Sequence, residues 1–298
     1  MLSRIEFRAF RNLEPASLAL PPGGTLILGE NGAGKTSLLE AIYVLSTSRS
    51  FRAPRLVDCI TRSSKLGPSP TEPESTDDAA EDLDAAVAPG FHLVGETAGR
   101  QRLELYFDGD QRRRRLNGES VPLGRYLGAQ PVIAWTASDL DVLVGPPAAR
   151  RRFMDRGVVA LRPSSIDGIA RYRRALAEKR SLLQRGCRPA DLEPWNLVLA
   201  AAAAPLIERR LDYVRRLKVA LAAVEEICQL GIGPLDVAYR PSPKGGEDGE
   251  EALVERFEAE AEREIAAQMP LYGPHRDELK IRFRGSAVRD VASAGERK

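Results

Sequence analysis

The sequence predicts an α/β fold in which a mixed sheet with flanking helices is joined to a second, helical lobe. Short apolar or alternating segments surround a glycine-rich loop within the first 135 residues. Beyond residue 147, long stretches rich in alanine and arginine repeat apolar side chains at three- or four-residue steps, which is typical of packed helices. Strand character returns at residues 279–283, where apolar side chains alternate, and we expect this segment to rejoin the first sheet.

The N-terminal segments predict a strand, a turn and a strand before the glycine-rich loop. Residues 2–10 (LSRIEFRAF) alternate loosely, and residues 17–20 are expected to pair with them. Residues 21–24 (PPGG) form a turn, and Thr25–Leu28 predicts a short buried strand. After the loop, residues 36–46 predict a helix from apolar residues at helical spacing: Leu38, Leu39, Ile42 and Leu45.

The later elements follow the same two patterns. Residues 91–96 and 102–107 predict strands, with a hairpin turn at residues 108–110 (DGD). Pro131–Trp135 predicts another short buried strand, with Trp135 in the core. Helices are expected in three stretches: 149–186, 194–229 and 251–268. Residues 63–90 contain almost no large apolar side chains, so we interpret them as a disordered surface insertion.

The glycine-rich loop carries the clearest chemistry. Residues 29–36 (GENGAGKT) fit GxxxxGK[ST] at every fixed position, and the three glycines permit backbone angles that direct N–H groups at phosphate oxygens. Lys35 supplies a cation for the β- and γ-phosphates, and Thr36 offers a hydroxyl to Mg²⁺ at the start of a helix. We therefore predict nucleotide binding with ATP and Mg²⁺ as cofactors. The candidate residues are Gly29, Glu30, Asn31, Gly32, Ala33, Gly34, Lys35, Thr36 and Ser37.

An acid that would anchor Mg²⁺ for hydrolysis is not evident. Residues 106–108 (YFD) precede a turn, and residues 132–139 (VIAWTASD) contain Thr and Ser where a Walker B strand would be apolar. No catalytic residue is predicted, and Asp108 and Asp139 are the first acids to examine. Three scattered cysteines and two histidines match no usual zinc site or disulfide framework. His275 is expected to have a structural or nucleotide-proximal polar role.

Charge is unevenly distributed although the net charge is only +2. Residues 71–84 carry seven acids and no bases, whereas residues 150–188 carry twelve Lys or Arg and three acids. We expect some arginines to pair with acids inside the fold and others to meet DNA phosphates. The candidates are Arg112, Arg113, Arg114, Arg115, Arg150, Arg151 and Arg152. We find no signal peptide or membrane-spanning stretch, so a cytoplasmic location without membrane contact is expected.

Several segments in order along the chain resemble the RecF family, recombination-mediator ATPases related to SMC proteins. They are FRN at 10–12, NGAGKTSLLEAIYVLSTSRSFR at 31–52, DLDVLVGPPAARRRFMD at 139–155, RYRRALAEKRSLL at 171–183, LEPWN at 192–196 and GPHRDELKI at 273–281. The last residues, ASAGERK at 292–298, are similar to an ABC-type signature, with Glu296 where Gln is usual. Residues 63–90 are not part of the pattern.

The resemblance implies a P-loop head of ABC/SMC type, formed by residues 1–146 and 269–298, and a helical lobe, residues 147–268. It implies that Ser293, Ala294 and Gly295 contact the nucleotide of a second subunit, so that two heads close around ATP as a homodimer. The implied partners are a RecR-like mediator and DNA, both double-stranded DNA and single/double-strand junctions, bound mainly through phosphates. The implied roles are DNA replication, recombinational repair, loading of recombinase at gapped DNA and the SOS response.

Hydrolysis is a separate matter. The family is a weak ATPase, and its pattern continues past the signature into a Walker B strand that the printed sequence does not contain. We therefore expect almost no ATP turnover from these 298 residues.

Two alternatives stay open at this point. A P-loop small-molecule kinase would need a lid and an acceptor site near the loop, but this chain has Arg-rich helices instead. An SMC-like ATPase coupled to a nuclease would need an acidic metal-binding domain, and the sequence contains no candidate for one.

Overall fold

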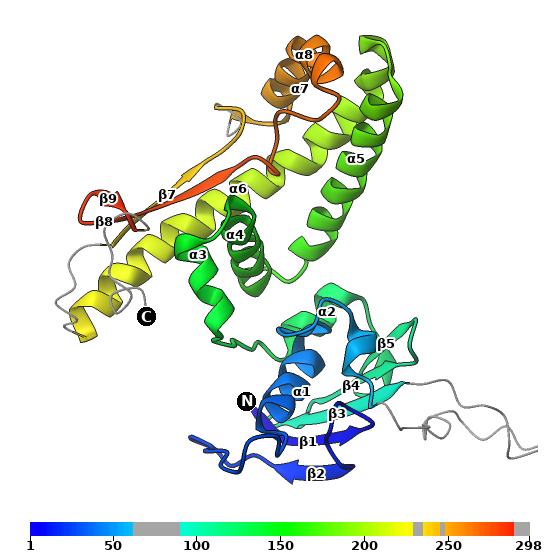
Figure 1. Ribbon diagram of the computed structural model, residues 1–298, viewed down its shortest axis with the longest axis vertical. Helices are drawn as coiled ribbons and strands as arrows, with labels where there is room; N and C mark the ends of the chain where they lie inside the picture. Colours follow the sequence, from blue (N-terminus) through cyan, green and yellow to red (C-terminus); the bar gives the residue numbers. More distant parts are fainter. Residues whose placement is uncertain (62–89, 229–234, 245–247, 289–298) are drawn as a thin grey trace, which may run out of the picture. The chain divides into compact units, whose positions relative to one another are not determined.

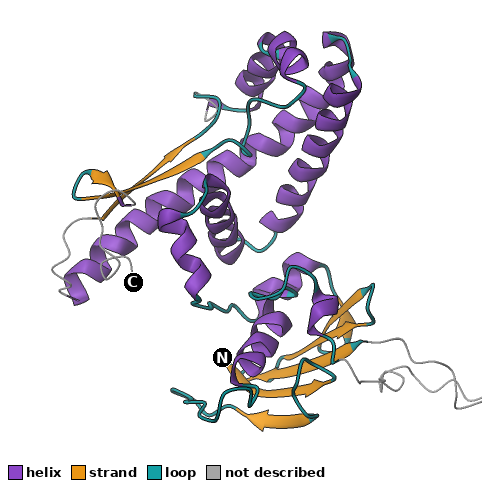
Figure 2. Ribbon diagram, viewed as in Figure 1, coloured by secondary structure: helices purple, strands orange, loops and turns teal. Residues whose placement is uncertain are grey.

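The computed structural model describes residues 1–61, 90–228, 235–244 and 248–288. They divide into two compact units, Met1–Ala134 and Trp135–Lys298. The first is an α/β unit and the second is mainly helical, as the sequence predicts (Figure 2). The proposed signature residues 293–295 and most of the predicted insertion at 63–90 lie outside the described residues.

The first unit is built on a six-stranded sheet with the order β2-β1-β3-β4-β5-β6, in which every neighbouring pair is antiparallel. The predicted strands near residues 2–10, 17–20, 91–96 and 102–107 are confirmed. The strands are β1 (Leu2–Arg8), β2 (Ala16–Ala19), β3 (Phe91–Thr97), β4 (Arg102–Phe107), β5 (Arg112–Leu116) and β6 (Glu119–Ser120).

Two helices, α1 (Lys35–Thr47) and α2 (Leu123–Ala129), lie over the same face of this sheet (Figure 1). The apolar side of α1 packs into one core with the inward side chains of the strands. Gly95 of β3 permits this close packing, because a Cβ atom there would lie 2.5 Å from the Leu45 side chain of α1. A short 3-10 helix, η1 (Leu56–Cys59), follows α1. The predicted helix at 36–46 is therefore confirmed with one added residue at each end.

The second unit contains a long helix, α6, against which α5 and α7 pack through a shared apolar core. A small antiparallel sheet with the order β7-β8-β9 belongs to the same unit. Its helices are η2 (Ala137–Leu140), α3 (Asp141–Val144), α4 (Pro147–Leu161), α5 (Ser165–Arg185), α6 (Pro189–Cys228), α7 (Glu250–Ala259) and α8 (Ala261–Ala267). Its strands are β7 (Leu235–Arg240), β8 (Glu278–Phe283) and β9 (Ser286–Ala287).

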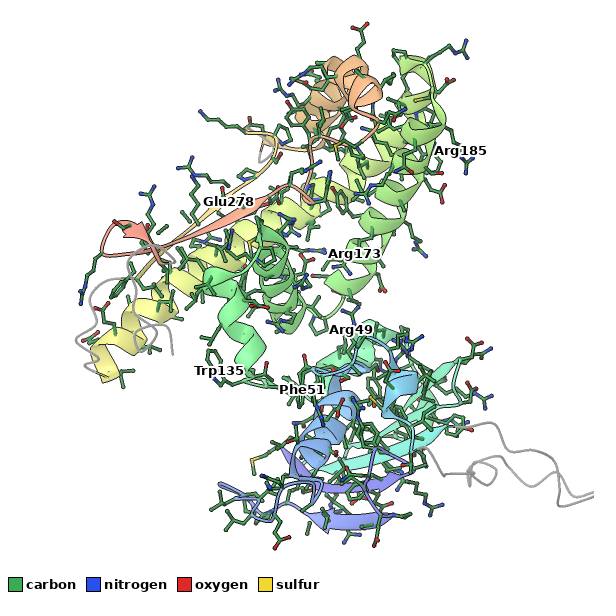
Figure 3. The ribbon with its side chains drawn as sticks, viewed as in Figure 1. Arg49, Phe51, Trp135, Arg173, Arg185 and Glu278 are labelled. Atoms are coloured by element: carbon green, nitrogen blue, oxygen red, sulfur yellow. The ribbon has the colours of Figure 1, made fainter. Side chains whose placement is uncertain are left out.

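Three expectations about strands are wrong. The C-terminal strand β8 pairs with β7 and β9 rather than with the first sheet, because β7 provides a complete antiparallel partner within its own unit. Thr25–Leu28 and Pro131–Trp135 form no strand, and Leu26, Ile133 and Trp135 are 81%, 96% and 74% exposed. Trp135 is labelled in Figure 3. An apolar run becomes a strand only when a neighbour pairs with its backbone, and no described strand pairs with either segment.

Candidate nucleotide-binding site

The phosphate loop, residues 29–36, lies directly before and at the first turn of α1. Gly29, Gly32 and Gly34 all have positive φ, at 153°, 88° and 88°. Gly34 is the N-cap residue of α1, and its left-handed backbone turns the chain into the helix. These angles are unfavourable for residues with a Cβ atom. The backbone thus has the angles for which glycines are expected, and the role of its N–H groups in binding phosphate stays a prediction.

Lys35 and Thr36, the residues predicted to bind phosphate and Mg²⁺, are the first two residues of α1. The Lys35 ammonium donates hydrogen bonds to the carbonyl oxygens of Gly29 and Glu30, both at 2.7 Å, so it lies across the loop. Thr36 is exposed in the first turn of a thirteen-residue helix. Because a helix N-terminus carries a partial positive charge and free N–H groups, these residues fit a nucleoside triphosphate with its Mg²⁺.

A turn at Phe10-Arg11-Asn12 contacts the phosphate loop. The Asn12 amide donates a hydrogen bond to the Gly32 carbonyl at 2.8 Å and accepts one from the Ser37 hydroxyl at 2.7 Å. Ser37 is buried, so its hydroxyl is committed to Asn12 rather than exposed beside the loop. These contacts join residues 20 to 25 positions apart, and local sequence patterns do not reveal them. The only available signal was the resemblance carried by FRN at 10–12.

The buried carboxylate of Glu40, on α1, joins this turn to the segment after the helix. Arg11 donates to both Glu40 oxygens, at 3.0 and 2.7 Å, and the hydroxyl of Ser50 and the guanidinium of Arg52 also bond to the carboxylate. Burial acts to raise the pKa of Glu40, but the hydrogen bonds from Arg11 and Ser50 outweigh it and lower the pKa. Burial and the nearby carboxylate raise the pKa of the Cys59 thiol to about 12, so this thiol stays neutral.

The arginine run at residues 112–115 is divided between the two faces of the sheet. Its residues form β5, in which successive side chains point to opposite faces. Arg114 pairs in register with the buried Leu105 and donates to Ser48 at 2.9 Å, on the face that α1 covers. Arg113 pairs with Tyr106 on the other face and stacks over its ring, with 5.6 Å from the guanidinium carbon to the ring centroid. Arg112 is exposed at the start of the strand.

The arginines at 150–152 of α4 also differ from one another. Arg150 donates to the Gly145 carbonyl at 2.9 Å, and Arg151 donates to the Asp277 carbonyl at 3.2 Å. Arg152 is exposed and forms no hydrogen bond or ion pair with any described residue. Arg150 and Arg151 are thus held by backbone carbonyls, and not by the acids that were expected to pair with some of the arginines.

The two acids singled out in the sequence are engaged in local contacts. Asp108 accepts hydrogen bonds from the backbone N–H groups of Asp110 and Gln111 in the β4–β5 turn, which lower its pKa. Asp139 accepts hydrogen bonds from Thr136 and from Arg156, and these lower its pKa against the effect of burial. No group of three or more His, Cys, Asp or Glu side chains among the described residues is arranged to hold a metal ion.

The GPHRD segment at 273–277 is fastened into the second unit by buried charges. Asp277 is fully buried, bonds to Arg210 of α6 at 2.7 Å and accepts a hydrogen bond from Tyr239 of β7. Arg210 also pairs with Asp155 of α4, which in turn accepts from Arg173 of α5, a residue labelled in Figure 3. This network ties three helices and a strand to one turn.

His275 belongs to this turn and has the structural role expected for it. Its Nδ1 atom lies 2.7 Å from the Tyr172 hydroxyl, and its Nε2 atom lies 3.2 Å from the Pro270 carbonyl. A neutral imidazole satisfies both contacts, accepting at Nδ1 and donating from Nε2. Burial lowers the pKa of His275 to about 4, which keeps the ring neutral at physiological pH.

Comparisons with known proteins agree with these features. Residues 1–80 match the family model described as the RecF/RecN/SMC N terminal domain. Across its whole length, the chain is 32% identical to the DNA replication and repair protein RecF of Stenotrophomonas maltophilia (strain R551-3), and it covers 77% of that protein. The chain belongs to the RecF family. The RecF of Moorella thermoacetica (strain ATCC 39073 / JCM 9320) is also 32% identical, with 74% of it covered.

The fold of this RecF-family chain is similar to that of a solved RecF structure. The match to the recombination mediator protein RecF with ATP in the RecFOR pathway has a TM-score of 0.82 at 23% identity, covering 99% of this chain and 76% of that one. The likeness confirms the predicted fold class, a P-loop head of ABC/SMC type with a helical second lobe. No described helix has the length and apolar character needed to cross a membrane.

Proposed function

We propose that this protein is an ATP-dependent DNA-binding protein of RecF type that acts in DNA replication and recombinational repair. The observation that carries the proposal is the phosphate loop, with three glycines at positive φ and Lys35 lying across it at the start of α1. The relatives are named DNA replication and repair proteins. That name fits neither of the two alternatives, a small-molecule kinase and a nuclease-coupled ATPase. A related RecF has been solved with ATP.

In this proposal, residues 29–37 bind ATP, and Thr36 holds Mg²⁺ when nucleotide is present. ATP closes two copies of the chain on DNA, with Ser293, Ala294 and Gly295 of one copy facing the nucleotide of the other. A RecR-like protein is the partner, and the complex helps to load recombinase at gapped DNA. The assignment of residues 1–146 and 269–298 to the ATPase lobe and of 147–268 to the helical lobe stays a prediction.

The DNA contacts belong to the exposed arginines. Arg112, Arg113 and Arg152 form no salt bridge with an acid among the described residues, so they are the proposed phosphate contacts. Phosphate contacts of this kind strengthen binding without reading base sequence.

Nucleotide binding is the first step to test. Lys35→Ala removes the one side-chain cation of the loop, so the affinity for a fluorescent ATP analogue should fall by at least tenfold, about 1.4 kcal/mol. Lys244→Ala, which removes an exposed lysine from the second unit, is the matched control and should bind like the unaltered protein. Equal affinities for the unaltered protein and Lys35→Ala would exclude the loop from the mechanism.

A further inference from the structure

The side chain of Asn12, which lies outside the phosphate loop, forms hydrogen bonds with the loop and with the helix that follows it. Asn12 lies on the turn between β1 and β2, and its amide bonds at one end to the Gly32 carbonyl and at the other to the Ser37 hydroxyl. Gly32 is inside the loop, whereas Ser37 is in the first turn of α1. The two bonds therefore join the loop to the helix on either side of residues 33–36.

The turn that carries Asn12 is itself firmly held. Phe10 is fully buried, and the backbone of Arg11 bonds to the Cys59 carbonyl at 2.7 Å and to the Thr61 hydroxyl at 2.6 Å. The Arg11 guanidinium is fixed on the buried Glu40, which belongs to α1. Because this ion pair joins the turn to α1, the turn holds Asn12 at a fixed position relative to the helix.

The bond to Gly32 has a particular electrostatic consequence. A backbone carbonyl carries partial negative charge, which would repel phosphate oxygens if it turned toward them. While the Gly32 carbonyl accepts the Asn12 amide, that peptide plane is not free to rotate. Glycine has the fewest steric barriers to such rotation, so the hydrogen bond from Asn12 restricts the backbone most at this residue.

We propose that Asn12 is a positioning residue that holds the phosphate loop in the shape that receives the nucleotide phosphates, an inference that rests on the proposed function. Asn12 acts through the Gly32 carbonyl and the Ser37 hydroxyl and does not itself touch the nucleotide.

The test is a double-mutant cycle with Asn12→Ala and Ser37→Ala, read by the affinity for a fluorescent ATP analogue and by competition with inorganic tripolyphosphate. Loss of the two neutral hydrogen bonds should weaken both ligands about tenfold in Asn12→Ala and about threefold in Ser37→Ala. In the Asn12→Ala background, Ser37→Ala should cause no further loss of affinity, because the Ser37 hydroxyl has already lost Asn12 as its hydrogen-bond acceptor. Ser17→Ala, an exposed change on β2, is the control and should change nothing.

Two outcomes would overturn the proposal. If Asn12→Ala leaves the affinity for both ligands unchanged, Asn12 does not position the loop. If Ser37→Ala lowers the affinity by the same factor with and without Asn12→Ala, Ser37 binds the phosphates directly. Amide hydrogen exchange of residues 29–37, measured without nucleotide, tests the role of Asn12 independently of ATP binding and so of the proposed function. Faster exchange in Asn12→Ala than in Ser17→Ala supports this role even if no ATP binding is found, and equal exchange rates refute it.

Discussion

At the scale of single residues, Glu40 connects segments that are distant in sequence. Its carboxylate is fully buried, and the Arg11 side chain that pairs with it is 22% exposed. The pair spans 29 positions, and further bonds reach Ser50, Arg52 and Cys59. The sequence shows Glu40 only as an acid within an amphipathic helix, so its burial depends on tertiary contacts that no local pattern encodes. The positive φ angles of the three loop glycines, by contrast, were predictable, because they depend on local backbone geometry.

The Glu40 carboxylate should make stability depend on pH in a defined window. Its pKa is lowered in the folded state, so its contribution is complete above the unfolded value of about 4.3 and is lost as pH falls through the folded value. Glu40→Gln should therefore lower the free energy of unfolding by about 2 kcal/mol at pH 7, because Arg11 loses the charged acceptor of its hydrogen bonds. The difference from the unaltered protein should shrink below about pH 4.3.

Urea denaturation of both proteins between pH 3 and pH 7 measures this difference, and the contribution of His275 cancels because both proteins contain it. Glu14→Gln removes an exposed carboxylate two positions beyond Asn12 and should leave stability unchanged. A Glu40→Gln deficit that stays constant down to pH 3 would show that its cause is altered packing rather than charge.

At the scale of elements, the predictions succeeded where a segment shows a strong period and failed where it depends on a partner. The helix at 36–46 and the hairpin around residues 108–110 were correct, because apolar spacing and turn residues are local signals. The expected single helix at 149–186 is divided into α4 and α5 around residues 162–164, which include Pro163. Thr25–Leu28 has the composition of a buried strand, but strand formation also requires a paired neighbour.

The crossing of α4 and α6 depends on a missing side chain. A Cβ atom at Gly157 of α4 would lie 2.1 Å from the Tyr213 ring of α6, so Gly157→Ala should force the ring aside and cost about 1–3 kcal/mol. Gly168→Ala on α5 is the matched control, since its Cβ atom would lie 3.5 Å from the nearest atom, the Arg209 guanidinium, and alanine favours the helix. Thermal unfolding should thus show a lower Tm for the first variant and an equal or higher Tm for the second. The opposite order would mean that α4 and α6 do not cross at these residues.

At the scale of the whole molecule, the distribution of charge matters more than its total of +2. The basic stretch at 150–188 is partly neutralised within the fold, since Arg156, Arg173 and Lys179 each pair with an acid. Lys179 and Glu264 form a fully buried pair at 2.6 Å, which fastens α5 to α8. Counting bases along the sequence therefore overstates the charge available to a nucleic acid. Pairing of some bases with acids was expected, but the sequence does not show which ones pair, because the pairs depend on tertiary contacts.

DNA binding should accordingly depend on a few exposed arginines, and its dependence on salt should reveal which. Each phosphate contact that is lost should flatten the plot of log affinity against log salt concentration by about 0.9 for duplex DNA. Arg112→Ala and Arg152→Ala should each flatten the slope, and to the same extent for unrelated DNA sequences, because phosphates carry no sequence information. Arg114→Ala provides the matched control within the same strand, since its side chain bonds to Ser48 beneath α1. It should lower thermal stability and leave the slope unchanged. Filter binding across a salt series measures all three variants. A flattened slope for Arg114→Ala together with unchanged slopes for Arg112→Ala and Arg152→Ala would contradict the proposed phosphate contacts.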